Sequence, residues 1–127
     1  MTEIVLVDDN QDFLGLVKNL LEQEGMTVRC AESGEEALSE LRENTFHLMI
    51  TDLNLPGLDG FALSWKALEI APCMPIIMAT GDIYPGISRM AKEAGIANVL
   101  FKPFHPSEML YAVKDAIGFQ GKKVLLV

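Results

Sequence analysis

The sequence predicts an α/β domain with a doubly wound, five-stranded parallel sheet and five helices. The first observation is a series of short apolar runs rich in β-branched residues, typical of strands that are covered on both faces. The second is that segments with apolar residues at three- and four-residue spacing lie between these runs. The third is that no linker, charge block or low-complexity stretch interrupts the alternation, so we expect one domain.

The predicted strands follow directly from the apolar runs. They cover residues 4–7, 27–31, 47–51, 76–80 and 97–101. Each helix between them should pack back onto the sheet through a right-handed crossover.

The helices are predicted from their apolar stripes and their end signals. The first carries its stripe on residues 13–21 and should stop at Gly25; the second starts at a capping box, Ser33–Glu36 by sequence. The third runs over about 58–70 before Pro72, and the fourth over about 86–94 before Gly95. The fifth should begin near Pro106 and end at Gly118.

Composition narrows the class of protein. The chain has 127 residues, of which 50% are hydrophobic and 22% charged, so it can bury a core and is not expected to be disordered. No apolar run reaches the length of a membrane span, and residues 1–7 lack the features of a secretion signal, so a cytoplasmic protein is expected. The net charge of −8 argues against direct binding to nucleic acid or to anionic membranes. Cys30 and Cys73 are interpreted as small buried hydrophobes, not as a disulfide or a zinc site.

Polar residues gather where the predicted strands end. The first strand is followed by Asp8 and Asp9, the third by Asp52, the fourth ends at Thr80, and the fifth is followed by Lys102. In open parallel sheets, ligands bind outside these carboxyl ends. We therefore expect the five side chains to converge on one pocket.

Each of these residues also has an ordinary explanation. Asp8 or Asp9 could cap the helix that begins near Asn10, Asp52 and Thr80 could belong to turns, and Lys102 could be solvated. The occurrence of all five residues at one edge of the sheet favours a shared pocket over five separate ordinary explanations. Clustered carboxylates in such a pocket need a cation, and a ligand set made only of oxygen suits Mg²⁺. Asp52 would then be a metal ligand or a nucleophile that forms an aspartyl phosphate.

Four sequence motifs resemble the response regulator receiver family. They are residues 7–9 (VDD), 51–60 (TDLNLPGLDG), 79–81 (ATG) and 101–104 (FKPF), within a resemblance over residues 3–118. It implies a flavodoxin-like fold with strand order 2-1-3-4-5. The receiver domain would occupy residues 1–121, and 122–127 would be a tail or the start of a following module. Because 122–127 repeat the apolar pattern of 2–7, an added edge strand and a homodimer formed through this tail are further hypotheses.

The resemblance also implies a role for each site residue. Asp52 would accept a phosphoryl group from a histidine kinase or a histidine phosphotransfer protein, and the switch would act on a downstream protein or a linked module. The protein would assist its own phosphorylation and dephosphorylation without being an enzyme in the usual sense. The resemblance implies that Asp9, Asp52, the backbone carbonyl of Asn54 and, through water, Asp8 bind Mg²⁺. It implies that Thr80 and Lys102 contact the phosphate and that the Lys102–Pro103 bond is cis. Asn54 and Asp82 would tune the lifetime of the phosphate.

One position departs from the family pattern. The family often has Tyr or Phe three residues before the lysine, and this chain has Val99. The departure keeps open a second hypothesis, an interaction module on the same fold that is not phosphorylated. A third, a phosphatase or nucleotide-binding enzyme, is disfavoured because residues 8–12 contain no glycine-rich phosphate cradle and because His47 and His105 are poorly placed for catalysis.

Overall fold

The computed structural model describes residues 1–122, and residues 119–122 by their backbone only. The predicted alternation of strands and helices is confirmed. The strands are β1 (Glu3–Val7), β2 (Thr27–Ala31), β3 (Leu48–Thr51), β4 (Ile76–Thr80) and β5 (Asn98–Phe101). The helices are α1 (Gln11–Glu22), α2 (Gly34–Glu43), α3 (Gly60–Ile70), α4 (Ile87–Glu93) and α5 (Pro106–Lys122).

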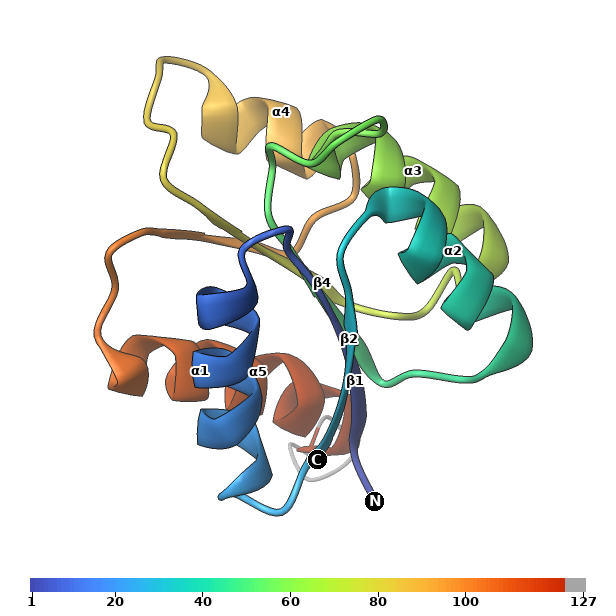
Figure 1. Ribbon diagram of the computed structural model, residues 1–127, viewed down its shortest axis with the longest axis vertical. Coiled ribbons are helices and arrows are strands. Elements are labelled where there is room, and N and C mark those ends of the chain that lie inside the picture. The colour runs from blue at the N-terminus through green and yellow to red at the C-terminus, as the bar shows by residue number, and fades with distance from the viewer. Residues whose placement is uncertain (123–127) are drawn as a thin grey trace.

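The strands form one parallel sheet in the order β2-β1-β3-β4-β5, as expected. Helices α1 and α5 lie on one face of the sheet, and α2, α3 and α4 lie on the other (Figure 1). The chain adds β2 on one side of β1 and then adds β3, β4 and β5 on the other side, so the order of strands reverses between β1 and β3. That is the place where a ligand site is expected in a doubly wound fold.

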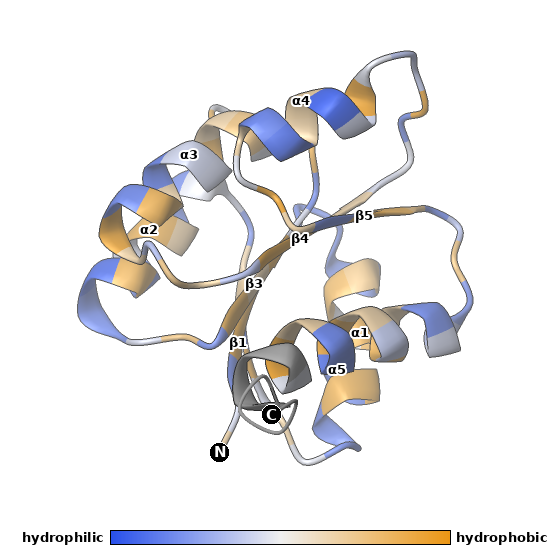
Figure 2. Ribbon diagram, turned by 180° about the vertical axis from the view of Figure 1, so that it is seen from behind, coloured by the Kyte–Doolittle hydropathy of each residue, from blue (hydrophilic) through white to orange (hydrophobic). Residues whose placement is uncertain are grey.

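The sheet packs against its helices through two apolar cores, one on each face. Along β1, Val5 and Val7 point into the core under α2, α3 and α4, whereas Ile4 and Leu6 point into the core under α1 and α5. All four side chains are fully buried, which explains why this strand reads as a continuous apolar run. The middle strands are correspondingly hydrophobic in Figure 2.

Glycines mark the helix ends at two of the three predicted places. Gly25 and Gly95 have φ of 84° and 87°, in the left-handed region that ends a helix. Gly118 is not among the described residues with positive φ, and α5 continues to Lys122. The predicted stop at Gly118 is therefore wrong, because glycine lowers helix stability by only about 1 kcal/mol and does not by itself end a helix.

The helix starts agree with the prediction to within a turn. Ser33 caps α2 and accepts the N–H of Glu36, while the Glu36 carboxylate accepts the N–H of Glu32 instead of that of Ser33. The third helix begins at Gly60, later than predicted, because Asp59 caps it and accepts the N–H of Ala62.

The prediction that both cysteines are buried is wrong. Cys30 is half-buried on β2, and Cys73 is exposed. Cys73 lies in the connection between α3 and β4, after the helix that Pro72 was expected to stop, and such connections run over the surface.

Two further expectations concern the membrane and the C-terminal tail. Among residues 1–122, no helix is long and apolar enough to cross a membrane. Residues 123–127 lie outside the described residues, so the edge strand and the homodimer formed through this tail stay predictions.

Candidate acidic pocket

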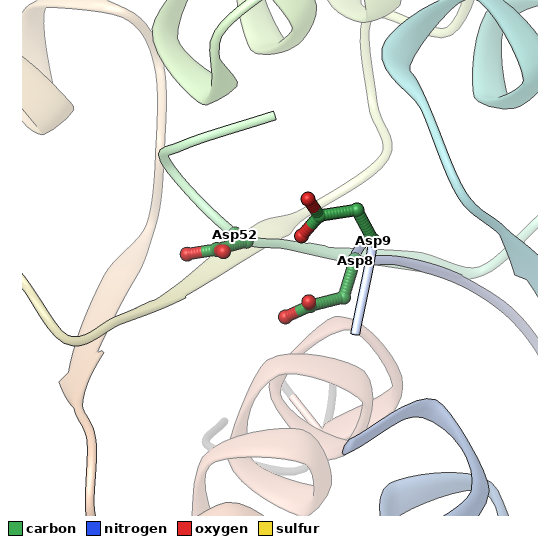
Figure 3. Close-up of side chains that lie close together, drawn as sticks. All are labelled: Asp8, Asp9 and Asp52. Atoms are coloured by element: carbon green, nitrogen blue, oxygen red, sulfur yellow. The ribbon is translucent and has the colours of Figure 1, made fainter. Parts of the chain in front are cut away.

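Asp8, Asp9 and Asp52 come together at the carboxyl edge of the sheet. Asp8 and Asp9 follow β1 and Asp52 follows β3, and their side chains lie close to one another (Figure 3). One carboxylate oxygen from each lies within 4.8 Å of the others. Asp8 is buried, Asp52 is largely buried, and Asp9 is exposed. The predicted convergence of these three carboxylates is confirmed.

Strand pairing holds the carboxylates side by side. Val7 of β1 lies opposite Thr51 of β3 in the parallel register. The pairing continues past the strand ends, where the N–H of Asp52 donates to the carbonyl of Val7 at 3.0 Å. The N–H of Asp8 donates to the carbonyl of Ala31 on β2 at 3.1 Å. The backbone positions of Asp8 and Asp52 are thus fixed by the sheet, not by a mobile loop.

The helix cap that was considered for Asp8 or Asp9 belongs to another residue. Asn10 is the N-cap of α1, and its side-chain oxygen accepts the N–H of Phe13 at 3.0 Å. Asp8 accepts the N–H of Asn10 at 2.9 Å through Oδ1. Its second oxygen, Oδ2, remains directed at the pocket.

Lys102 supplies the only ammonium among the described residues that forms ion pairs with these carboxylates. Its Nζ lies 2.8 Å from Asp8 Oδ2 and 3.8 Å from Asp52 Oδ2. The N–H of Lys102 donates to the carbonyl of Thr80 at 2.8 Å, which ties it to the end of β4. The bond between Lys102 and Pro103 is cis, as expected. The solvated-lysine alternative is therefore wrong.

The surroundings of Asp52 make its charged form less favourable than that of an ordinary carboxyl group. Burial is the largest cause, and it raises the pKa of the Asp52 carboxyl above its usual value. Lys102 lowers the pKa in opposition, and Asp8 and Asp9 raise it further. The N–H of Leu53, which donates to Asp52 Oδ1 at 2.8 Å, also favours the charged form. The net effect is a raised pKa, because one ammonium does not offset burial and two neighbouring carboxylates.

Thr80, Asp82 and Asn54 form a second hydrogen-bonded group at the carboxyl ends of β3 and β4. Thr80 is fully buried, and its hydroxyl accepts the N–H of Asp82 at 3.1 Å. The Asn54 side-chain amide donates to the carboxylate of Asp82, which joins the loop after β3 to the loop after β4. Both residues were singled out from the sequence, but their mutual contact was not foreseen. The available signal is that Asn54 stands two residues beyond Asp52 and Asp82 two residues beyond Thr80.

Val99 lies on β5, opposite Met78 of β4, and its side chain is half-buried. It lines a cavity of about 540 Å³ between β5 and α4, together with Ser88 and Lys92 among others. A residue smaller than the family's common aromatic therefore stands next to open space.

Two residues of the site were missed by the sequence reasoning. The ring of Phe13 lies under the Lys102 ammonium, with Nζ 4.0 Å from the ring centroid. Gly60 is buried against the loop that carries Asp52, where an added Cβ would overlap the Asp52 carbonyl oxygen and lie 2.9 Å from the Cα of Leu53. Both contacts depend on how the elements pack, so spacing along the sequence does not reveal them.

The three carboxylates fit a hard divalent cation. They offer oxygen atoms only, their oxygens are close enough to share one ion, and their charge exceeds that of the single nearby ammonium. Mg²⁺ prefers such ligands and commonly keeps several waters when it binds. The cluster can therefore hold a metal ion, and the contribution of the Asn54 carbonyl to it stays a prediction.

Known proteins resemble this chain over nearly all of its described length. It is 31% identical over 117 residues to the response regulator receiver protein CpdR of Brucella abortus, covering 92% of this chain and 98% of CpdR. It is 36% identical to the transcriptional regulatory protein GltR of Pseudomonas aeruginosa, but that match covers 87% of this chain and only 47% of GltR. The similarity to the C4-dicarboxylate transport transcriptional regulatory protein DctD of Rhizobium meliloti, at 31% identity, covers 89% of this chain and 25% of DctD.

Solved structures agree with these relatives. A receiver domain protein (CheY-like) from Methanospirillum hungatei superposes with a TM-score of 0.92 at 32% identity, covering 97% of this chain and 98% of that one. The BeF3 activated DrrB receiver domain gives a TM-score of 0.86 at 29% identity, covering 93% and 98%. The family model of the response regulator receiver domain matches residues 4–114. The chain belongs to the response regulator receiver domain family.

Proposed function

We propose that this receiver domain is a Mg²⁺-dependent switch that accepts a phosphoryl group on Asp52 from a histidine kinase or a histidine phosphotransfer protein. The observation that carries the proposal is the position of the Asp52 carboxylate, which lies beside two other carboxylates and 3.8 Å from the Lys102 ammonium. Such a pocket can receive a dianionic group only if positive charge accompanies it.

The transfer is a displacement at phosphorus. A carboxylate oxygen of Asp52 forms a bond to the phosphorus atom, and the P–N bond of the phosphohistidine breaks. The imidazole nitrogen leaves with the electron pair of that bond. The carboxylate attacks in its ionised form, so no proton has to be removed from Asp52.

Each neighbouring residue has a proposed task in this step. Asp9 and Asp52 would bind the Mg²⁺ ion directly, Asp8 would bind it largely through water, and the Asn54 carbonyl would add a ligand. The bound ion would supply positive charge that offsets the charge of the incoming group. Lys102 would contact one phosphoryl oxygen, and Thr80 would turn from the N–H of Asp82 to donate its hydroxyl to another.

The output is proposed to be a change in protein contacts. The relatives allow two arrangements, because CpdR is nearly as long as the matched region whereas GltR and DctD extend well beyond it. We propose residues 1–121 as the receiver domain, which acts on a separate protein or on a linked module. Asn54 and Asp82 would set how long the phosphoryl group persists.

A second candidate is a receiver-fold interaction module that works without phosphorylation. The observation in its favour is Val99, which leaves the usual aromatic switch position without a ring. The assembled carboxylates and Lys102 favour the first proposal, because a constitutive binding surface does not need three clustered carboxylates of which one is unfavourably buried.

Intact mass spectrometry separates the two. The protein is incubated with acetyl phosphate, with Mg²⁺ or with EDTA, and its mass is measured before and after mild base. One base-labile phosphoryl adduct that requires Mg²⁺ is expected. Asp52→Asn should abolish it, whereas Asp12→Asn, an exposed carboxylate on α1, should not. A protein that stays unmodified in all conditions would support the constitutive module.

A further inference from the structure

The Lys102 ammonium has three neighbours of different chemistry. Two are the carboxylates of Asp8 and Asp52, at 2.8 and 3.8 Å. The third is the face of the Phe13 ring, whose centroid lies 4.0 Å from Nζ. This distance is well inside the range in which the negative face of an aromatic ring attracts a cation.

The ring itself is held in place. Phe13 lies in the first turns of α1, where its N–H donates to the Asn10 side chain at 3.0 Å. Phe104, just after the cis Lys102–Pro103 bond, packs edge-on against the ring at 6.0 Å between centroids and 82° between planes. Edge-to-face packing is a favoured aromatic geometry, so the contact with Phe104 restrains the Phe13 ring beside the ammonium.

We propose that Phe13 is a positioning residue for Lys102, holding its ammonium over the acidic pocket by a cation–π contact. The functional part of this inference rests on the phosphoryl transfer proposed above. Asp8 now makes the closest contact with Lys102, but the same carboxylate is needed for the metal site. With Asp8 engaged at the proposed metal site, the ring would still keep Nζ beside Asp52, where a phosphoryl oxygen would arrive.

The Lys102 side chain is partly exposed, so its ammonium needs a contact that restrains its position. Its side chain retains 24% of its accessible surface, so water competes for the ammonium on the open side of the pocket. A long, flexible side chain without the ring would sample that water more often. The ring therefore limits the positions of Nζ without adding a negative charge that would repel the phosphoryl group.

The contact is tested first in metal-free protein, without any phosphorylation. Urea unfolding is measured for Phe13→Leu, Lys102→Met and the double variant. We expect a coupling of about fivefold in the unfolding equilibrium constant, the size of a partly exposed cation–π contact. Additive effects of the two substitutions would overturn the inference.

The positioning role is tested by grading the ring's charge distribution at nearly constant volume. Phe13 is replaced by 4-fluoro-, 3,5-difluoro- and 3,4,5-trifluorophenylalanine, and the rate of Asp52 phosphorylation by acetyl phosphate is measured at saturating Mg²⁺. We expect the rate constant to fall stepwise, by about fivefold across the series. The same series at Phe61, a half-buried ring in the opposite core, should leave the rate unchanged. In a Lys102→Met background the Phe13 series should be flat.

The outcomes distinguish this inference from the proposed function. Phosphorylation that is insensitive to fluorination of Phe13 would overturn the positioning role and leave the phospho-acceptor intact. An unsubstituted protein that takes up no phosphoryl group, yet shows the Phe13–Lys102 coupling in unfolding, would remove the proposed function together with the role in transfer. The contact itself would stand.

Discussion

The Lys102 ammonium lies 2.8 Å from the Oδ2 atom of Asp8, which makes this the closer of its two ion pairs with the acidic pocket. Asp8 is 1% exposed, so removal of Lys102 would leave a buried carboxylate without its cation. We expect Lys102→Met to lower the free energy of unfolding in EDTA by about 2 kcal/mol. This is less than the roughly 3–5 kcal/mol of fully buried pairs, because water reaches Lys102.

Urea denaturation with EDTA and with Mg²⁺ measures this effect. Mg²⁺ should reduce the loss, since the ion neutralises the same carboxylates. Lys114→Met removes an exposed ion pair with Glu24 and should cost less than about 1 kcal/mol in either condition. Equal losses for the two variants in EDTA would contradict a structural role for the Lys102–Asp8 pair.

The raised pKa of Asp52 predicts how stability depends on pH. The folded protein binds the Asp52 proton more tightly than the unfolded chain does. The associated stability is fully present below the unfolded pKa of about 3.9, and it is lost as the pH rises through the raised folded pKa. We therefore expect Asp52→Asn to be more stable than the unsubstituted protein at pH 7 without metal, and the gain to vanish below about pH 4.

This comparison uses urea midpoints at several pH values in EDTA. Asp12→Asn is the matched control, because Asp12 is an exposed carboxylate in the first turn of α1. Its substitution should not stabilise the protein at pH 7, since a negative charge there favours the helix. A destabilised Asp52→Asn protein at neutral pH would contradict the unfavourable burial of this carboxylate.

Metal binding to the three carboxylates should stabilise the folded state. At a free Mg²⁺ concentration of about 100 times Kd, the gain in the free energy of unfolding is about 2.7 kcal/mol. Asp9→Asn should weaken the binding by removing a ligand from the cluster. Measuring the thermal unfolding midpoint at increasing Mg²⁺ concentrations tests both effects. A midpoint that does not change up to millimolar Mg²⁺ would contradict metal binding at these carboxylates.

The backbone of the acidic pocket could be predicted from the sequence, but several of its side-chain contacts could not. Asp8, Asp52 and Lys102 each follow a strand, and parallel strands bring their carboxyl ends to one edge. This geometry needs only the order of the strands. The hydrogen bond between Asn54 and Asp82 depends on two loop conformations and two rotamers, which no periodicity encodes.

Errors at the helix ends and connections have a similar origin. Gly118 has the residue type of a helix stop but lacks the left-handed backbone of Gly95, and the backbone of α5 continues as a helix to Lys122. Cys73 is a residue type that is usually buried, but it lies in a surface connection. Local residue preference decided the prediction in both cases, and tertiary context decided the structure.

Gly60 must remain without a side chain because its backbone lies against the loop that carries Asp52. A Cβ there would overlap the Asp52 carbonyl oxygen and crowd Leu53, and the Gly60 N–H donates to the Leu53 carbonyl at 2.7 Å. We expect Gly60→Ala to cost about 1–3 kcal/mol and to weaken Mg²⁺ binding, because the loop carrying Asp52 must move. Gly15→Ala, in α1 with open space around it, should gain up to about 1 kcal/mol. Similar changes for both variants in urea unfolding would contradict the close approach at Gly60.

The hydrogen bond between Asn54 and Asp82 predicts that substitutions of these two residues have different effects on the lifetime of the proposed aspartyl phosphate. The Asn54 side-chain amide donates a hydrogen bond to the Asp82 carboxylate. In Asn54→Ala that half-exposed carboxylate is free to accept a proton from water near the phosphorus atom, so hydrolysis should accelerate by about tenfold, below the range of well-placed general bases. In Asp82→Ala no such base exists, so hydrolysis should not accelerate.

The double variant decides between the bridge and the individual residues. If Asp82 acts only when Asn54 releases it, Asn54→Ala combined with Asp82→Ala should hydrolyse as slowly as Asp82→Ala alone. Loss of the base-labile adduct, followed by intact mass after removal of acetyl phosphate, gives the rate for each variant. A double variant as fast as Asn54→Ala would show that the amide blocks water directly, and the carboxylate would then have no part in the reaction.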